Sequence, residues 1–158
     1  MIAPAIFKLL LPIACSWAEK QEHLIHREGI PLTRSQIADA KRIGIREPDR
    51  VRLRVVEEIP LPLHPMLKAA AERTKLISPH TIGLTVRYGI FIRSDCWGDR
   101  ALVVHELAHT AQYERLGGFR PFLKAYLDEC LTPPGYPFGP LEQEAKRIER
   151  EVCSNEGQ

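Results

Sequence analysis

Two histidines and a glutamate in the segment 103–111 are the residues whose types and spacing could do chemistry. His105 and His109 stand four residues apart, and Glu106 directly follows the first histidine. Residues four apart lie on one face of an α-helix, so both imidazoles can bind one metal ion. Glu106 is rotated from His105 by about 100°, and we expect it to act as a general base on a water at the open side of the metal. The pattern predicts a hydrolytic zinc site.

A third protein ligand must come from elsewhere, because a catalytic zinc site takes three and leaves one position for water. The downstream candidates are Asp128, Glu129, Cys130, Glu142 and Glu144. Residues 140–152 have apolar side chains at helical spacing, and Glu142 and Glu144 flank this stripe on opposite sides. Periodicity does not choose between them, and either could be a solvated carboxylate in the first turn of a helix.

The chain resembles the gluzincin group of zinc metallopeptidases, and most closely its small bacterial metallopeptidase-like domains. The resemblance covers the two histidines and the segment from Tyr136 to Ala145, which contains Pro-Leu-Glu-Gln-Glu-Ala. In related gluzincins a later helix supplies a glutamate ligand three residues before a small residue. This rule selects Glu142 rather than Glu144. The resemblance implies a zincin-like fold in which Zn²⁺ is held by His105, His109 and Glu142.

Two further residues near this segment bear on the expected site. In several such families an aspartate follows the small residue and supports a histidine ligand. This chain has Lys146 there, so another carboxylate or a backbone carbonyl must orient the imidazole. Tyr136 lies in the proline- and glycine-rich loop 132–140 and could donate a hydrogen bond to an oxyanion. The alternative, which we favour from the sequence, is a ring that packs the loop onto the core.

The elements that must position these residues follow an α+β pattern. Helices are expected over 16–27, 33–44, 66–75, 101–116 and 140–152, and a strand is expected over 51–59. Two runs rich in β-branched residues, 82–86 and 90–92, predict a hairpin, or alternatively one bent strand broken at Gly89. We expect one zincin-like domain over 1–158 with several helices around a small antiparallel or mixed sheet. Its N-terminal helical segment is 1–30, and 81–153 holds the sheet edge, the active-site helix and the third-ligand helix.

The resemblance also suggests an edge strand that binds extended peptide, at Gly89–Ile92. The alternative is that Ile90 and Ile92 are core residues of an inner strand, and we prefer it.

Composition excludes several other classes of protein. A net charge of +2 is too small to indicate nucleic-acid binding, and acidic residues interrupt the basic residues of 41–54, which reads as a solvated face. The four cysteines are widely spaced without a Cys-x-x-Cys pair, which argues against a disulfide framework. Cys130 remains the alternative third ligand if both glutamates fail.

The apolar segment 6–15 is too short to span a membrane. We expect it to form a helix that packs on the domain of a cytoplasmic protein. The alternative is a signal for export.

The leading hypothesis is a zinc-dependent metallopeptidase that hydrolyses peptide or protein substrates, with Glu106 and Tyr136 as catalytic residues. The alternative is a metallopeptidase-like zinc-binding protein that acts as a binding or assembly module. Lys146 and the short chain motivate that alternative.

Overall fold

The computed structural model describes residues 4–154, and within this range the chain forms six α-helices, two 3-10 turns and a four-stranded mixed sheet. The helices are α1 (Pro4–Glu28), α2 (Arg34–Ile43), α3 (Pro65–Arg73), α4 (Arg100–Leu116), α5 (Phe119–Leu131) and α6 (Pro140–Ser154). The strands are β1 (Ile30–Pro31), β2 (Arg52–Val56), β3 (Gly83–Val86) and β4 (Gly89–Arg93), and the 3-10 turns are η1 (Pro48–Arg50) and η2 (Ser94–Cys96). The expected α+β class is confirmed.

The sheet has the strand order β1-β2-β4-β3, with β2 parallel to β4 and the other two pairs antiparallel. The predicted hairpin is confirmed as β3 and β4. Because β4 lies between β2 and β3, the expectation of an exposed edge at Gly89–Ile92 is wrong. Ile90 and Ile92 are both 0% exposed, as the core alternative predicted. The edge strand beside the histidine helix is β3.

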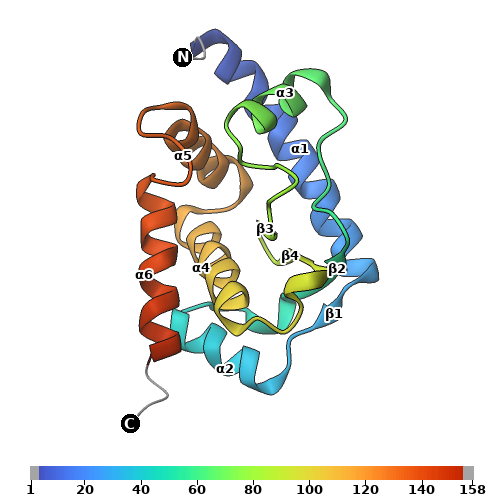
Figure 1. The fold of residues 1–158 in the computed structure, drawn as a ribbon, viewed down its shortest axis with the longest axis vertical. Coiled ribbons are helices and arrows are strands. Elements are labelled where there is room, and N and C mark those ends of the chain that lie inside the picture. Colours follow the sequence, from blue (N-terminus) through green and yellow to red (C-terminus); the bar gives the residue numbers. More distant parts are fainter. Residues whose placement is uncertain (1–3, 155–158) are drawn as a thin grey trace.

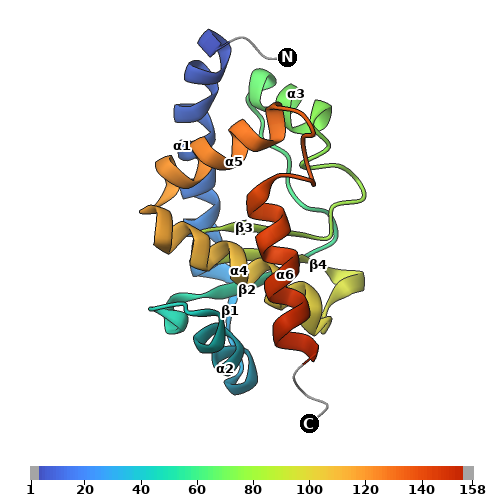
Figure 2. The same ribbon diagram turned by 90° about the vertical axis from the view of Figure 1, so that its left-hand side faces the viewer.

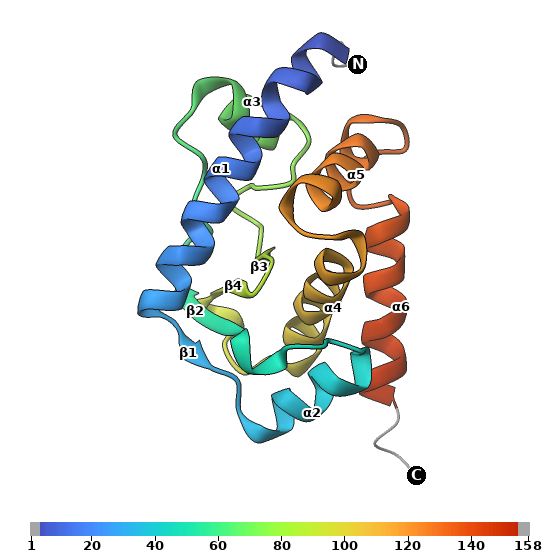
Figure 3. The same cartoon turned by 180° about the vertical axis from the view of Figure 1, so that it is seen from behind.

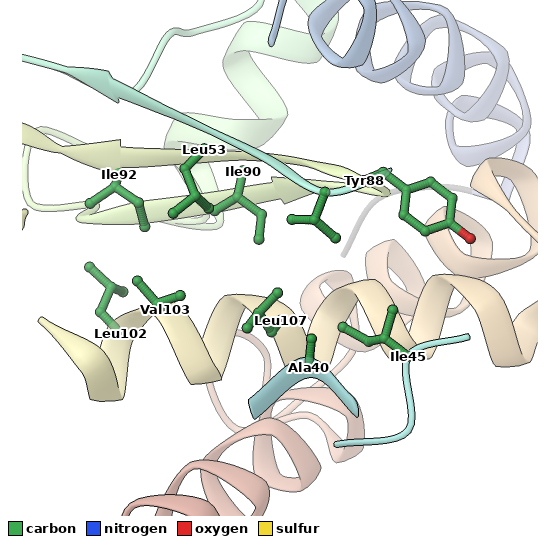
Figure 4. Close-up of a cluster of buried hydrophobic side chains, with 10 residues drawn as sticks. Ala40, Ile45, Leu53, Tyr88, Ile90, Ile92, Leu102, Val103 and Leu107 are labelled. Atoms are coloured by element: carbon green, nitrogen blue, oxygen red, sulfur yellow. The ribbon is translucent and has the colours of Figure 1, made fainter. Parts of the chain in front are cut away.

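Helices cover both faces of the sheet (Figures 1 and 3). Side chains alternate along a strand, so Ile90 and Ile92 face α4, while Phe91 packs with Ala18 and Ile25 of α1. Figure 4 shows the first of these layers, in which side chains of the sheet meet those of α4 and α2. Its labelled members are Ala40, Ile45, Leu53, Tyr88, Ile90, Ile92, Leu102, Val103 and Leu107. This packing holds α4 against the sheet.

The N-terminal segment forms one continuous helix, α1, with Pro12 inside it, rather than an apolar piece followed by a separate polar helix. Leu10 and Ala14 are buried with Leu67 of α3, so the apolar segment packs on the domain as expected. Farther along, the Glu22 carboxylate accepts hydrogen bonds from the Arg87 guanidinium, at 2.6 and 2.8 Å, and so ties α1 to the β3–β4 turn. Among residues 4–154, no helix is long and apolar enough to cross a bilayer.

Helix α6 lies beside α4 in Figures 1 and 3 and crosses it in Figure 2. Asp99 caps α4, its carboxylate accepting from the Leu102 N–H at 3.2 Å. Gly117 ends the helix with a φ of 105°, in the left-handed region that glycine adopts readily. Helix α6 begins at Pro140, and its Ala145 is 0% exposed. The small alanine permits close approach, so residues far apart in sequence meet between the two helices.

Candidate metal centre

His105, His109 and Glu142 converge where α4 meets the first turn of α6. Nε2 of His105 lies 3.1 Å from Oε2 of Glu142, and Nε2 of His109 lies 3.1 Å from Oε1 of the same carboxylate. One ligand atom from each residue lies within 4.8 Å of the other two. Ligand atoms at tetrahedral positions about 2.0–2.1 Å from zinc are about 3.3 Å apart. The spacing of these side chains therefore suits a zinc ion with little rearrangement.

The other nitrogen of each imidazole is already engaged. Nδ1–H of His105 donates to the Glu149 carboxylate at 3.0 Å. Nδ1–H of His109 donates to Oε1 of Gln112 at 2.8 Å, because the Gln112 amide is oriented by donating its own N–H to the Leu141 carbonyl at 2.9 Å. Such bonds fix the tautomer and ring orientation of metal-binding histidines. Both Nε2 atoms are thereby left for a metal.

Glu149 takes the supporting role for which Lys146 is unsuited. It stands two helical turns after Glu142, so both carboxylates lie on the face of α6 that meets α4. The Lys146 ammonium instead lies 5.9 Å from the centre of the Phe138 ring. The expectation that another carboxylate must orient a histidine is met by a residue that sequence reasoning did not identify.

Replacing Glu149 with alanine is expected to weaken zinc binding by about 10- to 100-fold, the usual cost of losing such a partner. The imidazole of His105 would lose the acceptor that holds its ring. Competition with a chromophoric chelator measures the affinity. Glu151→Ala is the matched control, since Glu151 lies on the same helix but is 59% exposed and pairs with Arg147. Equal affinities for the two variants would contradict this role of Glu149.

Glu142 is itself positioned by a phenol. The Tyr126 hydroxyl donates to Oε1 of Glu142 at 2.5 Å. Its ring stacks on Phe122, with centroids 5.3 Å apart, and meets the edge of His109 at 5.8 Å. Burial alone would raise the pKa of Glu142, but hydrogen bonds from His105, His109 and Tyr126 outweigh it and hold that pKa well below its usual range. Tyr126 was not identified from the sequence.

Glu144, the competing glutamate, has other partners. Its carboxylate accepts from the Arg115 guanidinium at 2.6 and 3.2 Å, and from the Gln112 amide at 3.4 Å. It thus helps to hold Gln112, which orients His109. The structure brings Glu142 to the histidines and leaves Glu144 on the neighbouring side of the helix, as the resemblance implied.

The remaining candidates for third ligand lie outside the group. Glu129 accepts from the Leu141 N–H at 3.0 Å and so caps α6, and Asp128 is exposed. Burial, with the charges of Glu142 and Glu129 adding to it, raises the pKa of Cys130 to about 12. The thiol is not part of the described group of side chains that could hold one metal ion.

Glu106 is held apart from the ligands, against the edge strand. It is 6% exposed, and the Thr85 hydroxyl donates to its Oε2 at 2.6 Å. At Gly83 the strand approaches so closely that a Cβ atom would lie 2.7 Å from Oε1 of Glu106. A larger residue at position 83 would therefore have to displace the Glu106 carboxylate. Gly83 and Thr85 were not singled out from the sequence, although the glycine within a β-branched run was a signal of close approach.

The three candidate ligands, Glu106 and Tyr136 line one cavity. Tyr136 is half-buried and packs against the aromatic cluster of α4 and α5, as the packing alternative predicted. It also borders the cavity, as the catalytic alternative requires. Burial, followed by the charges of Glu142 and Glu106, raises the pKa of Tyr136, so its hydroxyl keeps its proton at neutral pH.

Both histidines bind protons more tightly than free imidazole. Burial lowers the pKa of His105, but the hydrogen bond to Glu142 and the charge of Glu106 outweigh it and raise that pKa to about 9. Burial also lowers the pKa of His109, but the hydrogen bond to Glu142 and the charge of that carboxylate outweigh burial and raise the pKa. Zinc requires the neutral imidazole and must displace these protons.

We therefore expect zinc binding at pH 7 to release protons. Because the pKa of His105 is raised to about 9, the affinity should keep rising with pH up to about 9 instead of levelling near the ordinary value of about 6.5. Titration calorimetry in buffers of different ionisation enthalpy counts the released protons. Proton-independent binding between pH 7 and 9 would contradict the pairing of the histidines with Glu142.

No protein-family model, curated protein or solved structure matches this chain. Its function is therefore inferred from the chemistry of the site.

Proposed function

We propose that this protein is a zinc-dependent peptidase of the gluzincin type, which hydrolyses peptide bonds. The observation that carries the proposal is the convergence of His105, His109 and Glu142 in the wall of a cavity that also contains Glu106. Both imidazoles present Nε2 to the same point, while a second carboxylate stands beside them in the role of a base. A purely structural zinc site is closed by four protein ligands, whereas this group supplies three.

The chain's own residues would divide the work of hydrolysis. A zinc ion held by the three ligands supplies a Lewis acid that polarises the scissile carbonyl and makes water more acidic. Glu106 takes the proton of the attacking water and passes it to the leaving nitrogen. The Thr85 hydroxyl keeps that carboxylate aimed into the cavity. Tyr136, with its hydroxyl protonated, donates a hydrogen bond to the oxyanion.

The edge strand β3 offers a binding surface for the substrate backbone. All four of its residues line the cavity, and its ladder partner β4 occupies only one side. Arg93 N–H donates to the Ile82 carbonyl at 2.8 Å, so by the alternation of an antiparallel ladder Gly83 and Thr85 direct their backbone groups away from β4. The Thr85 carbonyl already accepts from the Tyr113 hydroxyl at 3.4 Å, so an extended peptide would add to this edge beside Gly83. We therefore assign peptide binding to β3 and not to the segment 89–92.

The test is chelator-sensitive cleavage of an unfolded protein by the purified full chain. We expect cleavage with zinc bound, loss of cleavage when a chelator strips the metal, and recovery when zinc is restored. Cleavage that persists after complete removal of the metal would contradict the proposal. Zinc binding without cleavage across a broad set of unfolded proteins would favour the alternative of a binding or assembly module.

A further inference from the structure

We propose that one end of the molecule, formed by the first turns of α1 and the start of α3, binds the surface of an anionic lipid membrane. None of the four apolar residues that form this surface lines the cavity of the candidate metal centre. The inference therefore does not depend on the proposed peptidase activity.

Exposed apolar side chains gather at this end. Among residues 4–154, nine large hydrophobic side chains are exposed, and four of them lie here: Ile6, Leu9, Leu63 and Met66. The first turns of α1 and the helix α3 lie at the same end of the long axis in all three ribbon views (Figures 1, 2 and 3). Leu10 and Leu67, the sequence neighbours of Leu9 and Met66, belong to one buried cluster. The four exposed residues thus form one surface, which we call the apolar end.

The tip of α1 is apolar on all sides. Within residues 4–11 the only charged side chain is Lys8. The domain buries Leu10 and Leu11, but it leaves Ile6 exposed and Leu9 61% exposed. A helix that is hydrophobic all round is normally covered by protein or by lipid. Part of this tip is therefore left for a partner to cover.

The apolar end is a protrusion and not a groove. The tip of α1 is the outermost part of the ribbon at that end (Figures 1 and 3). Leu63, in the loop that precedes α3, is 95% exposed. Projecting apolar side chains suit a bilayer, in which a helix buries its apolar face about 5–10 Å deep at the boundary between headgroups and acyl chains. A protein partner would need a matching hollow.

The charge around the apolar end favours anionic lipid. Residues 4–15 and 61–75 carry four basic side chains and one acidic side chain, a net charge of +3, whereas the rest of the chain has a net charge of −1. The neighbouring helix α5 adds two basic and two acidic side chains, which cancel. The four basic residues are Lys8, Lys68, Arg73 and Lys75.

These four basic side chains are exposed, and none of them forms an ion pair with another described residue. Arginines on other surfaces, such as Arg54 and Arg115, pair with glutamates. Basic side chains without such partners, beside an apolar surface, attract anionic headgroups. Apolar insertion and headgroup attraction thus act at the same end of the molecule.

Sedimentation of the purified full chain with lipid vesicles tests the inference. Each basic side chain near an anionic surface strengthens binding by about 5-fold. Binding to vesicles of phosphatidylcholine with phosphatidylglycerol should therefore be at least about 10-fold tighter than to phosphatidylcholine alone, and it should weaken as salt is raised. Equal binding to both kinds of vesicle, or binding to neither, would overturn the inference.

Two substitutions place a charge on the apolar end. Leu9→Glu and Leu63→Glu should each weaken vesicle binding by at least about 10-fold. Because Leu63 is almost fully exposed, its substitution should leave the fold unchanged. Ile30→Glu is the matched control, since Ile30 is also exposed but lies beyond the other end of α1, about 30 Å away along the helix. Wild-type binding by Leu63→Glu, or an equal loss in Ile30→Glu, would contradict the assignment.

A charge reversal tests the attraction to headgroups separately. Lys68→Glu should weaken binding to the anionic vesicles, whereas Lys41→Glu, which changes an exposed lysine of α2, should bind as the wild type does. Equal effects of the two substitutions would contradict the role of the basic side chains. Dimers that Leu9→Glu dissociates, in a protein that binds no vesicle, would show that a second copy covers the apolar end and would overturn the inference.

Discussion

Replacement of Glu106 by glutamine is expected to abolish hydrolysis while the zinc stays bound. The amide cannot take a proton from water, and general-base catalysis contributes about 10²- to 10⁴-fold, so kcat should fall by at least about 10²-fold. The fold should tolerate the change, because the glutamine oxygen can still accept from the Thr85 hydroxyl that now bonds Oε2 of Glu106. Cleavage assays on protein of measured zinc content provide the comparison.

A surface glutamate provides the control for this variant. Glu151 is 59% exposed on α6 and its carboxylate pairs with Arg147 on the protein surface, so Glu151→Gln should cleave at the wild-type rate. If Glu106→Gln retained that rate as well, Glu106 would not be the base. If it lost its zinc, the carboxylate would belong to the ligands and the division of roles between Glu106 and Glu142 would be wrong.

Replacement of His105 by alanine is expected to remove the zinc and the stability that it confers. Wild-type protein should carry about one zinc ion per chain, as expected for a single three-ligand site. At a free zinc concentration of 1,000 times Kd, binding to the folded state adds about 4 kcal/mol to the free energy of unfolding. Elemental analysis and denaturant unfolding with and without zinc measure both effects.

The exposed His80 supplies the matched substitution. His80→Ala should bind zinc and gain stability from it as the wild type does. An unfolding free energy of His105→Ala that still rises with zinc would show that the stabilising ion binds elsewhere. Equal zinc content in His105→Ala and His80→Ala would likewise show that the ion binds elsewhere.

Helix boundaries and the hairpin were predicted well, because helix caps and turns depend on residues close together in the sequence. Thr33 caps α2 with the full capping box, and Gly44 ends that helix at a φ of 102°, so its boundaries were readable from the sequence. The same holds for the hairpin of β3 and β4. The continuity of α1 was not predicted: the helix runs through Pro12, where Leu10 and Ala14 pack with Leu67 of α3. Tertiary contacts of this kind leave no local signature.

The sequence predicted which three side chains converge at the candidate site, but not the side chains that hydrogen-bond to them. His105 and His109 are joined by helical spacing, and Glu142 was selected by resemblance. Glu149 and Tyr126 support the ligands from positions that depend on how α6 and α5 pack against α4. Periodicity in a sequence shows which face of a helix is apolar. It does not show which polar side chains of two packed helices contact each other.

The edge strand illustrates the same limit. A hairpin has two strands, and the sequence does not say which of them pairs with a third. Here β4 pairs with β2 over five residue pairs, which leaves β3 at the edge. Glu106 thus faces Gly83 and Thr85, and the surface for the substrate lies one strand away from the position suggested by resemblance.

X-ray anomalous scattering at the zinc edge, on crystals of the purified full chain, tests the central claim most directly. The proposal predicts a zinc peak bonded to Nε2 of His105, Nε2 of His109 and a carboxylate oxygen of Glu142, at about 2.0–2.2 Å. Glu106 should lie outside the first shell, against Thr85. A peak bonded to a different set of side chains, or a zinc-saturated crystal with no peak between α4 and α6, would contradict it.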